Sequence, residues 1–251
     1  MTSKKPSKAT ERVKAMQAQQ AAAARRRRAV IGVIVVMVIA AVVGVGIVVQ
    51  SNRDEVAGTS VAPAGVTADN GVLRGQSDAP VDVVVYEDFQ CPICKAFEDN
   101  VESTMTSYID DGTVRLEYRP IAFLDEASST DYSSRALATA ACALDDGGPK
   151  VFARLHDLLF ANQPKEGTAG LDDATLAKLA GQAGADEAAV AACQSKGTYD
   201  GWVKDVTDQA SQDGIEGTPT YFVDGSKVAF TQDEEPKATL TRLIDQAASA
   251  Q

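Results

Sequence analysis

The sequence predicts an α/β fold with an inserted helical subdomain, preceded by a single N-terminal transmembrane helix. Three observations lead to this fold class. Residues 29–49 form an apolar run without a charge. The pattern of residues 81–123 predicts a strand, a helix and a second strand. Residues 128–213 show almost no strand pattern, and a hairpin pattern follows them. A β-helix-β unit interrupted by helices is the pattern of a sheet covered by helices rather than of an all-α or all-β domain.

The apolar run Ala29–Val49 is the predicted membrane anchor. Its 21 residues span a hydrocarbon core of roughly 30 Å at about 1.5 Å rise per residue. The alternative is a cleaved signal peptide, whose apolar region is shorter, about 7–15 residues, and ends at a small-residue cleavage site. No convincing cleavage site follows this run, so we expect an uncleaved anchor.

Charge is distributed unevenly along the chain. Residues 1–28 carry nine Lys or Arg and one acidic residue, whereas 29–251 carry fifteen basic and thirty-four acidic residues. Basic residues next to a span mark its cytoplasmic side, so Arg25 to Arg28 predict an extracytoplasmic C-terminal domain in a single-pass membrane protein. The acidic domain would repel a phosphate backbone, and topology accounts for the basic head, so we expect no nucleic-acid partner.

Four parts follow from composition and pattern. Residues 50–70 are rich in Ser, Gly, Ala, Asp and Asn and show no periodicity, which predicts a flexible linker. The predicted organisation is a cytoplasmic basic segment 1–28, a transmembrane anchor 29–49, the linker 50–70 and a folded domain 71–251.

The folded domain opens with a short strand in "VLR" and a β-branched strand over Val81–Phe89. The next segment, from Cys94 to Tyr108, carries apolar residues at spacings of three or four and predicts an amphipathic helix. A second strand follows over Thr113–Phe123. Because a helical crossover joins these two strands, we expect them to be parallel.

Five helical stripes then fill a predicted helical insertion over about 128–213, punctuated by glycines. The chain closes with strand-like runs at Thr218–Gly225 and Lys227–Phe230 around a turn, and with an amphipathic helix from Pro236.

The motif Cys91-Pro92-Ile93-Cys94 lies where the first long strand meets its helix. Pro92 suits the first helical position, which leaves Cys91 as the N-cap. A thiolate there gains hydrogen bonds from free backbone N–H groups and the positive end of the helix dipole, so we expect its pKa to fall below about 8.5. Cys91 is the predicted exposed nucleophile, and Cys94, on the core side, is the predicted resolving cysteine.

Metal and cofactor chemistry is not indicated. A zinc ribbon requires a second close Cys or His pair, and the chain has one histidine, His156. Covalent haem attachment requires histidine after the second cysteine, where Lys95 stands. His156 lies among helical apolar residues, which favours a packing or helix-surface role over catalysis, and Trp202 is expected in the core.

The order of elements, the cysteine motif and Thr218-Pro219 before the hairpin together resemble the DsbA-like thiol-disulfide oxidoreductases. The resemblance covers roughly 71–251 and implies a thioredoxin fold in a membrane-anchored member. It implies that the pair introduces disulfides into exported cysteine-containing polypeptides and is re-oxidised by a DsbB-like or VKOR-like membrane partner. It also implies that Pro219 is a cis proline facing the cysteines, next to an edge that pairs with extended substrate. The alternative is an ordinary trans proline at the start of a strand.

One departure concerns the dipeptide between the cysteines. The best-known oxidising members of the family carry histidine there, whereas this chain has Ile93, so a very low thiolate pKa is not carried over. Either Glu87 or Asp88 could tune the cysteines or relay a proton if buried beside Cys94. The alternative for Glu87 is a solvated acid at the end of a strand.

Cys142 and Cys193 remain after the motif is set aside. In an oxidising compartment two leftover cysteines indicate a structural disulfide, which would stabilise the fold by roughly 4 kcal/mol. The alternative is two free buried thiols.

Two other functions stay open at this stage. One is a tethered disulfide reductase or isomerase that uses the same cysteine pair in the opposite direction. The other is a non-catalytic peptide-binding chaperone whose Cys91–Cys94 bond is only a structural link.

Overall fold

The computed structural model describes residues 60–231 and 234–250. The predicted basic segment, the predicted anchor 29–49 and the first ten residues of the predicted linker lie outside them. Within the described residues, every helix is too short or too polar to cross a membrane.

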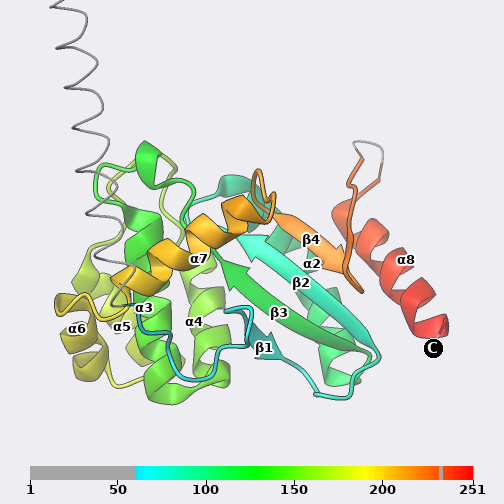
Figure 1. The fold of residues 1–251 in the computed structure, drawn as a ribbon, viewed down its shortest axis with the longest axis horizontal. Coiled ribbons are helices and arrows are strands. Elements are labelled where there is room, and N and C mark those ends of the chain that lie inside the picture. The colour runs from blue at the N-terminus through cyan, green and yellow to red at the C-terminus, as the bar shows by residue number, and fades with distance from the viewer. Residues whose placement is uncertain (1–59, 232–233, 251) are drawn as a thin grey trace, which may run out of the picture. The chain divides into compact units, whose positions relative to one another are not determined.

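The described residues form a sheet with the strand order β1-β3-β2-β4-β5 (Figure 1). β2 and β3 are parallel, and each of the other neighbouring pairs is antiparallel. The strand bounds are β1 Val72–Arg74, β2 Val81–Glu87, β3 Val114–Pro120, β4 Thr220–Val223 and β5 Ser226–Lys227.

The predicted β-helix-β unit is confirmed. Helix α2 (Pro92–Asp110) connects β2 to β3, whose register pairs Val81 with Val114 and Glu87 with Pro120. The inward-facing valines of β2 are fully buried, as expected of a β-branched strand at the centre of a sheet. This arrangement brings the carboxyl end of β2 directly to the amino end of α2.

The helical insertion is also confirmed. It gathers α3, α4, α5 and α6 together, while α8 lies beside β4 (Figure 1). Asp172 caps α5 and Asp186 caps α6, each by accepting hydrogen bonds from backbone N–H groups of the first turn. The bounds are η1 Asp125–Ala127, α3 Tyr132–Gly147, α4 Pro149–Ala161, α5 Asp173–Ala183, α6 Glu187–Ser195, α7 Asp200–Gln212 and α8 Pro236–Ser249.

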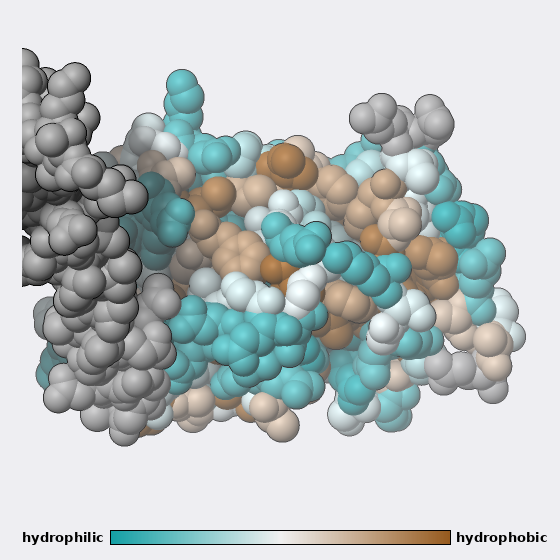
Figure 2. All heavy atoms as spheres, turned by 45° about the horizontal axis from the view of Figure 1, so that its top comes forward, coloured by the Kyte–Doolittle hydropathy of each residue, from teal (hydrophilic) through white to brown (hydrophobic). Residues whose placement is uncertain are grey.

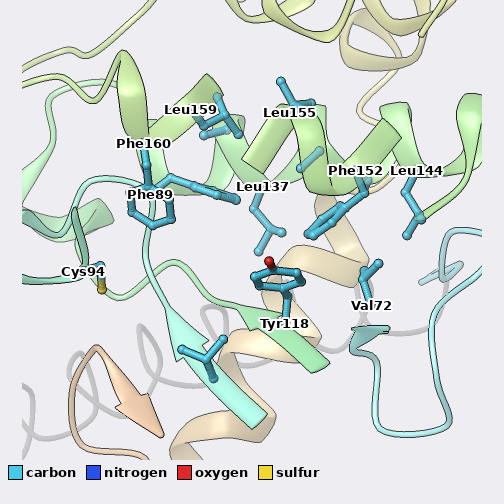
Figure 3. Close-up of a cluster of buried hydrophobic side chains, with 14 of the residues drawn as sticks. Val72, Phe89, Cys94, Tyr118, Leu137, Leu144, Phe152, Leu155, Leu159 and Phe160 are labelled. Atoms are coloured by element: carbon cyan, nitrogen blue, oxygen red, sulfur yellow. The ribbon is translucent and has the colours of Figure 1, made fainter. Parts of the chain in front are cut away.

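Helix α4 joins the insertion to the sheet. Its Phe152 and Phe160 point toward Tyr118 of β3 and Phe89 after β2, as Figure 3 shows. Ring centroids lie 6.0 Å apart for Phe152 and Tyr118, and 5.4 Å apart for Phe160 and Phe89. This aromatic layer fixes α4 directly behind the end of β2.

The predicted linker extends too far. Its residues 60–70 pack on the domain instead of forming a free tether: Pro63 is buried and Val66 pairs with Val72. The indole of Trp202, a core residue as expected, donates a hydrogen bond to Asn70 Oδ1 at 3.0 Å. Each of these contacts involves a single residue of the segment. The segment therefore shows no periodic pattern of apolar residues from which its packing could have been predicted.

A disulfide joins Cys142 of α3 to Cys193 of α6, with 6.0 Å between the Cα atoms. It closes a loop across the helical insertion, away from the Cys91 motif. The two cysteines of that motif are both in the free thiol form.

The surface mixes apolar and hydrophilic side chains, as Figure 2 shows for one face. Among residues 60–231 and 234–250, the large apolar side chains that are exposed are Val61, Leu73 and Ile93. Of these three, Ile93 lies between the two cysteines of the motif.

Candidate active site

Cys91 is the N-cap of α2, with extended backbone angles (φ −75°, ψ 114°). Pro92 follows in the first turn, where the missing N–H costs no helical hydrogen bond. The backbone N–H of Cys94 points at Cys91 Sγ across 3.4 Å. The local sequence thus places the first sulfur where unpaired N–H groups and the helix dipole favour a negative charge.

The expectation of an exposed nucleophile is wrong in one respect. Cys91 as a whole is only 6% exposed, whereas its neighbour Ile93 is 58% exposed. The reason is tertiary, because the loop before β4 lies against the sulfur and places the Thr218 carbonyl oxygen 3.4 Å from Cys91 Sγ. An attacking group therefore reaches the sulfur through a narrow opening.

The Thr218-Pro219 peptide bond is cis. More than 120 residues separate this loop from the cysteines in sequence, and the antiparallel pairing of β4 with β2 brings the two together. The Thr218 carbonyl can accept a hydrogen bond from the Cys91 thiol in the reduced protein.

The two cysteines differ in acidity. Hydrogen bonds from the Cys94 thiol, from Thr218 and from backbone N–H groups outweigh burial and lower the pKa of Cys91 to about 6. Burial, together with the neighbouring Cys91, raises the pKa of the Cys94 thiol far above its usual range. Near neutral pH the pair therefore holds one thiolate, on Cys91, and one thiol, on Cys94.

A groove of about 670 Å³ opens beside the motif. Its walls are Pro92 at the start of α2, Ala127, and the loop 163–167 after α4. Gln163 ties this loop to the motif, since its side-chain amide donates to the Cys91 carbonyl oxygen at 2.9 Å. The sequence did not identify Gln163, because a single glutamine at a helix end carries no pattern.

Asp88 is buried behind the motif and is held by three donors. Its carboxylate accepts hydrogen bonds from the Ser133 hydroxyl and from the backbone N–H groups of Gln90 and Leu124. Burial nevertheless dominates and raises its pKa to about 6. Asp88 thus connects the end of β2 to the insertion and faces the cysteines mainly through its backbone.

Glu87 is fully buried, so the alternative of a solvated strand-end acid is wrong. Its carboxylate turns away from the groove and meets His156 of α4, with 2.7 Å between Glu87 Oε1 and His156 Nε2. Burial alone would lower the pKa of His156, but the charges of Glu87 and Glu98 and the hydrogen bonds to Glu87 and Asp157 together raise it to about 10. The packing role expected for His156 is therefore accompanied by an ionic one.

Glu98 of α2 is partly buried and lies next to this pair. It was not identified from the sequence, because it is one of several acidic residues in the helix. Its carboxylate accepts a hydrogen bond from the Tyr221 hydroxyl at 3.1 Å. Burial raises its pKa to about 7. Glu87, Glu98 and His156 each offer one ligand-type atom, and these three atoms lie within 4.8 Å of one another.

Comparison with known proteins identifies the family of the chain. Residues 67–246 match the family model described as Thioredoxin, which covers more than half of the chain. The DsbA of Mycobacterium tuberculosis, solved in its oxidised form, is 31% identical, with a TM-score of 0.59, over 72% of this chain and 98% of that one. The chain belongs to the DsbA-like thiol-disulfide oxidoreductases of the thioredoxin fold.

Other relatives of this DsbA-like chain are matched over different shares of their own length. Disulfide bond formation protein D of Bacillus subtilis is 26% identical over 68% of this chain and 76% of its own length. The serine/threonine-protein kinase PknE of Mycobacterium tuberculosis is 34% identical over 182 residues. Those residues are 70% of this chain but only 31% of the kinase, so the DsbA-like chain spans about a third of that relative.

Proposed function

We propose that the chain is a membrane-tethered, extracytoplasmic oxidase that introduces disulfides into exported polypeptides through Cys91 and Cys94. One observation carries the proposal. The sulfur of Cys91 sits at the amino end of α2, receives the Cys94 N–H and has its pKa lowered to about 6. A thiolate stabilised in this way favours the reduced enzyme, and hence makes its disulfide a good oxidant.

The reaction proceeds by two exchanges that balance in electrons and protons. A substrate thiolate attacks Cys91 Sγ in the oxidised pair, the Cys91–Cys94 bond breaks, and Cys94 takes up a proton in its buried position. A second substrate thiolate then attacks the substrate sulfur of the mixed disulfide and releases Cys91 as the thiolate. The substrate loses two electrons, and the enzyme gains them.

Substrate binding involves the surface around the opening to Cys91. The exposed Ile93 offers an extended polypeptide an apolar contact, and the groove beside Pro92 offers it polar contacts. We assign Thr218 and Pro219 to substrate binding, because their loop borders the sulfur and leads into β4.

Glu87 contributes to this proposal as a positioning residue rather than a proton relay. Its carboxylate bonds to His156, and its negative charge acts on Cys94 through space, raising the pKa of that thiol as a minor contribution after burial. Burial is the main reason that Cys94 stays protonated while Cys91 is ionised, and Glu87 adds to it.

The location of the reaction rests on the sequence. The apolar run 29–49, preceded by four arginines, anchors the chain with the catalytic domain outside the cytoplasm. There a DsbB-like or VKOR-like membrane partner accepts the two electrons and regenerates the disulfide. Protease accessibility in intact cells tests this topology, since digestion of the domain only after membrane disruption would contradict it.

Equilibration of the purified protein with glutathione tests the direction of electron flow. An oxidase is expected nearer to the potential of DsbA, about −120 mV, than to that of thioredoxin, about −270 mV. A value near thioredoxin would favour the reductase or isomerase.

The substitution Cys91→Ser distinguishes a catalytic protein, whether oxidase or reductase/isomerase, from a non-catalytic chaperone. The variant is expected to lose all oxidation of a reduced model substrate, while Cys142→Ala/Cys193→Ala is the matched control that keeps the Cys91 motif. Unchanged activity in Cys91→Ser would support the non-catalytic chaperone.

A further inference from the structure

Glu87, Glu98 and His156 form a cluster in which Glu87 and His156 are buried and Glu98 is partly buried. It draws on three separate elements: the end of β2, the second turn of α2 and the middle of α4. Burying the carboxylate of Glu87 and the imidazole of His156 beside a second, partly buried carboxylate is costly unless their charges are balanced. The structure must therefore compensate the charges of these three side chains.

The first sign of a ligand is an unpaired oxygen. Glu87 is fully buried, its Oε1 contacts His156 Nε2, and its Oε2 has no hydrogen-bond partner. A buried carboxylate oxygen left without a donor is unusual, because losing water without gaining a partner costs free energy. A cation bound between the carboxylates would satisfy it.

The second sign is the orientation of the imidazole. His156 Nδ1 lies 3.2 Å from the carboxylate of Asp157, whereas Nε2 faces Glu87. A carboxylate behind the ring fixes the proton on Nδ1 and directs Nε2 toward a metal, which is how ligating histidines are commonly held.

The third sign is a small cavity next to Glu98. It is lined by Glu98, Tyr118 and Tyr221 among others and has a volume of about 10 Å³, close to the space of one water molecule. Other charged groups nearby are Arg74, which reaches the Tyr118 hydroxyl at 3.2 Å, Glu102, which also lines the cavity, and Asp157 beside the imidazole.

We propose that Glu87, Glu98 and His156 form a binding site for a divalent transition-metal ion, with Zn²⁺ as the best fit. Three protein ligands with one nitrogen and a single water complete a four-coordinate shell, whereas Ca²⁺ takes six to eight oxygens. At metal-ligand distances of about 2.0–2.2 Å the ion replaces the hydrogen bond between Glu87 and His156 and moves these groups slightly apart. None of the three ligands is a cysteine, and the site stands whether or not the proposed oxidase function does.

Calorimetric titration of the full chain with ZnCl₂ tests the proposal. The protein is first oxidised, so that the Cys91 and Cys94 thiols cannot ligate the ion, and excess Ca²⁺ is added to occupy exposed carboxylates. One Zn²⁺ per chain is expected. Glu87→Gln and Glu98→Gln are each expected to weaken binding at least about tenfold, while Glu187→Gln, which changes an exposed acid of α6, binds as wild type does.

Co²⁺ provides a second measurement that reports on the ligands directly. The oxidised wild type is expected to show the visible absorption of four-coordinate Co²⁺, and His156→Gln is expected to lose it, with circular dichroism verifying the fold of each variant. If His156→Gln does not fold, the two glutamate variants decide. No stoichiometric uptake by the wild type, or wild-type affinity in either Glu87→Gln or Glu98→Gln, overturns the proposal.

Discussion

Glu87 Oε1 and His156 Nε2 lie 2.7 Å apart, with both side chains 1% exposed. These residues are 69 positions apart in sequence and meet because α4 packs behind the end of β2. Without bound metal they form a buried ion pair. The pair belongs to the interior of the domain rather than to the surface where the cysteines react.

Glu87→Gln is expected to lower the free energy of unfolding by about 3 kcal/mol in metal-free protein. Removing one partner leaves a buried charge uncompensated, and the amide oxygen replaces only part of the interaction. Chemical denaturation followed by circular dichroism measures the change. Glu102→Gln is the matched control and should stay within about 0.5 kcal/mol of wild type. An equal loss in both variants would contradict the assignment.

The same pair predicts a dependence of stability on alkaline pH. The folded pKa of His156, about 10, lies above its ordinary value of 6.5. Its contribution is therefore fully present below about pH 6.5 and is lost as the pH rises through about 10, at about 1.4 kcal/mol per pH unit. The difference in unfolding free energy between wild type and Glu87→Gln should shrink across this window. A constant difference would show that the imidazole is not ionised in the folded protein.

Alkylation of Cys91 in the reduced protein should rise with pH about a midpoint near 6. The lowered pKa of Cys91 gives about a tenfold excess of thiolate over thiol at pH 7. Because this pKa is depressed in the folded state, the thiolate stabilises the reduced form at higher pH, and the stabilisation is lost as the pH falls through 6. The rate of iodoacetamide modification measures the midpoint, with Cys91→Ser as the control. A midpoint near 8.5 would refute a role for the helix terminus.

Cys142→Ala/Cys193→Ala should destabilise the protein by about 4 kcal/mol. The disulfide closes a loop with a sequence separation of 51, and its removal frees the unfolded chain. Urea unfolding of the oxidised proteins gives the difference, while the oxidation of a model substrate should persist below the melting temperature. Loss of activity in a variant that is still folded would connect this bond to the catalytic pair.

Much of the fold could be predicted from local patterns. Local patterns predicted the β-branched strand β2, the amphipathic helix α2 and the helical insertion. They could do so because the spacing of apolar residues indicates which face of an element is buried. The residues 60–70 were not, since they pack through single contacts such as Trp202 with Asn70. Contacts of this kind produce no periodic pattern in the sequence, so the burial of these residues could not be predicted.

The sequence by itself determined the pair of cysteines, the N-cap position of Cys91 and the helix dipole behind it, because these depend on neighbours within four residues. Only the tertiary structure decided that Cys91 is nearly covered by the Thr218 loop, that Glu87 is buried, and that Glu87, Glu98 and His156 converge. Those relationships depend on how β2, α2, α4 and β4 pack. The carboxylate of a strand-end acid looks the same in the sequence whether it faces water or an imidazole from a helix about 70 residues away.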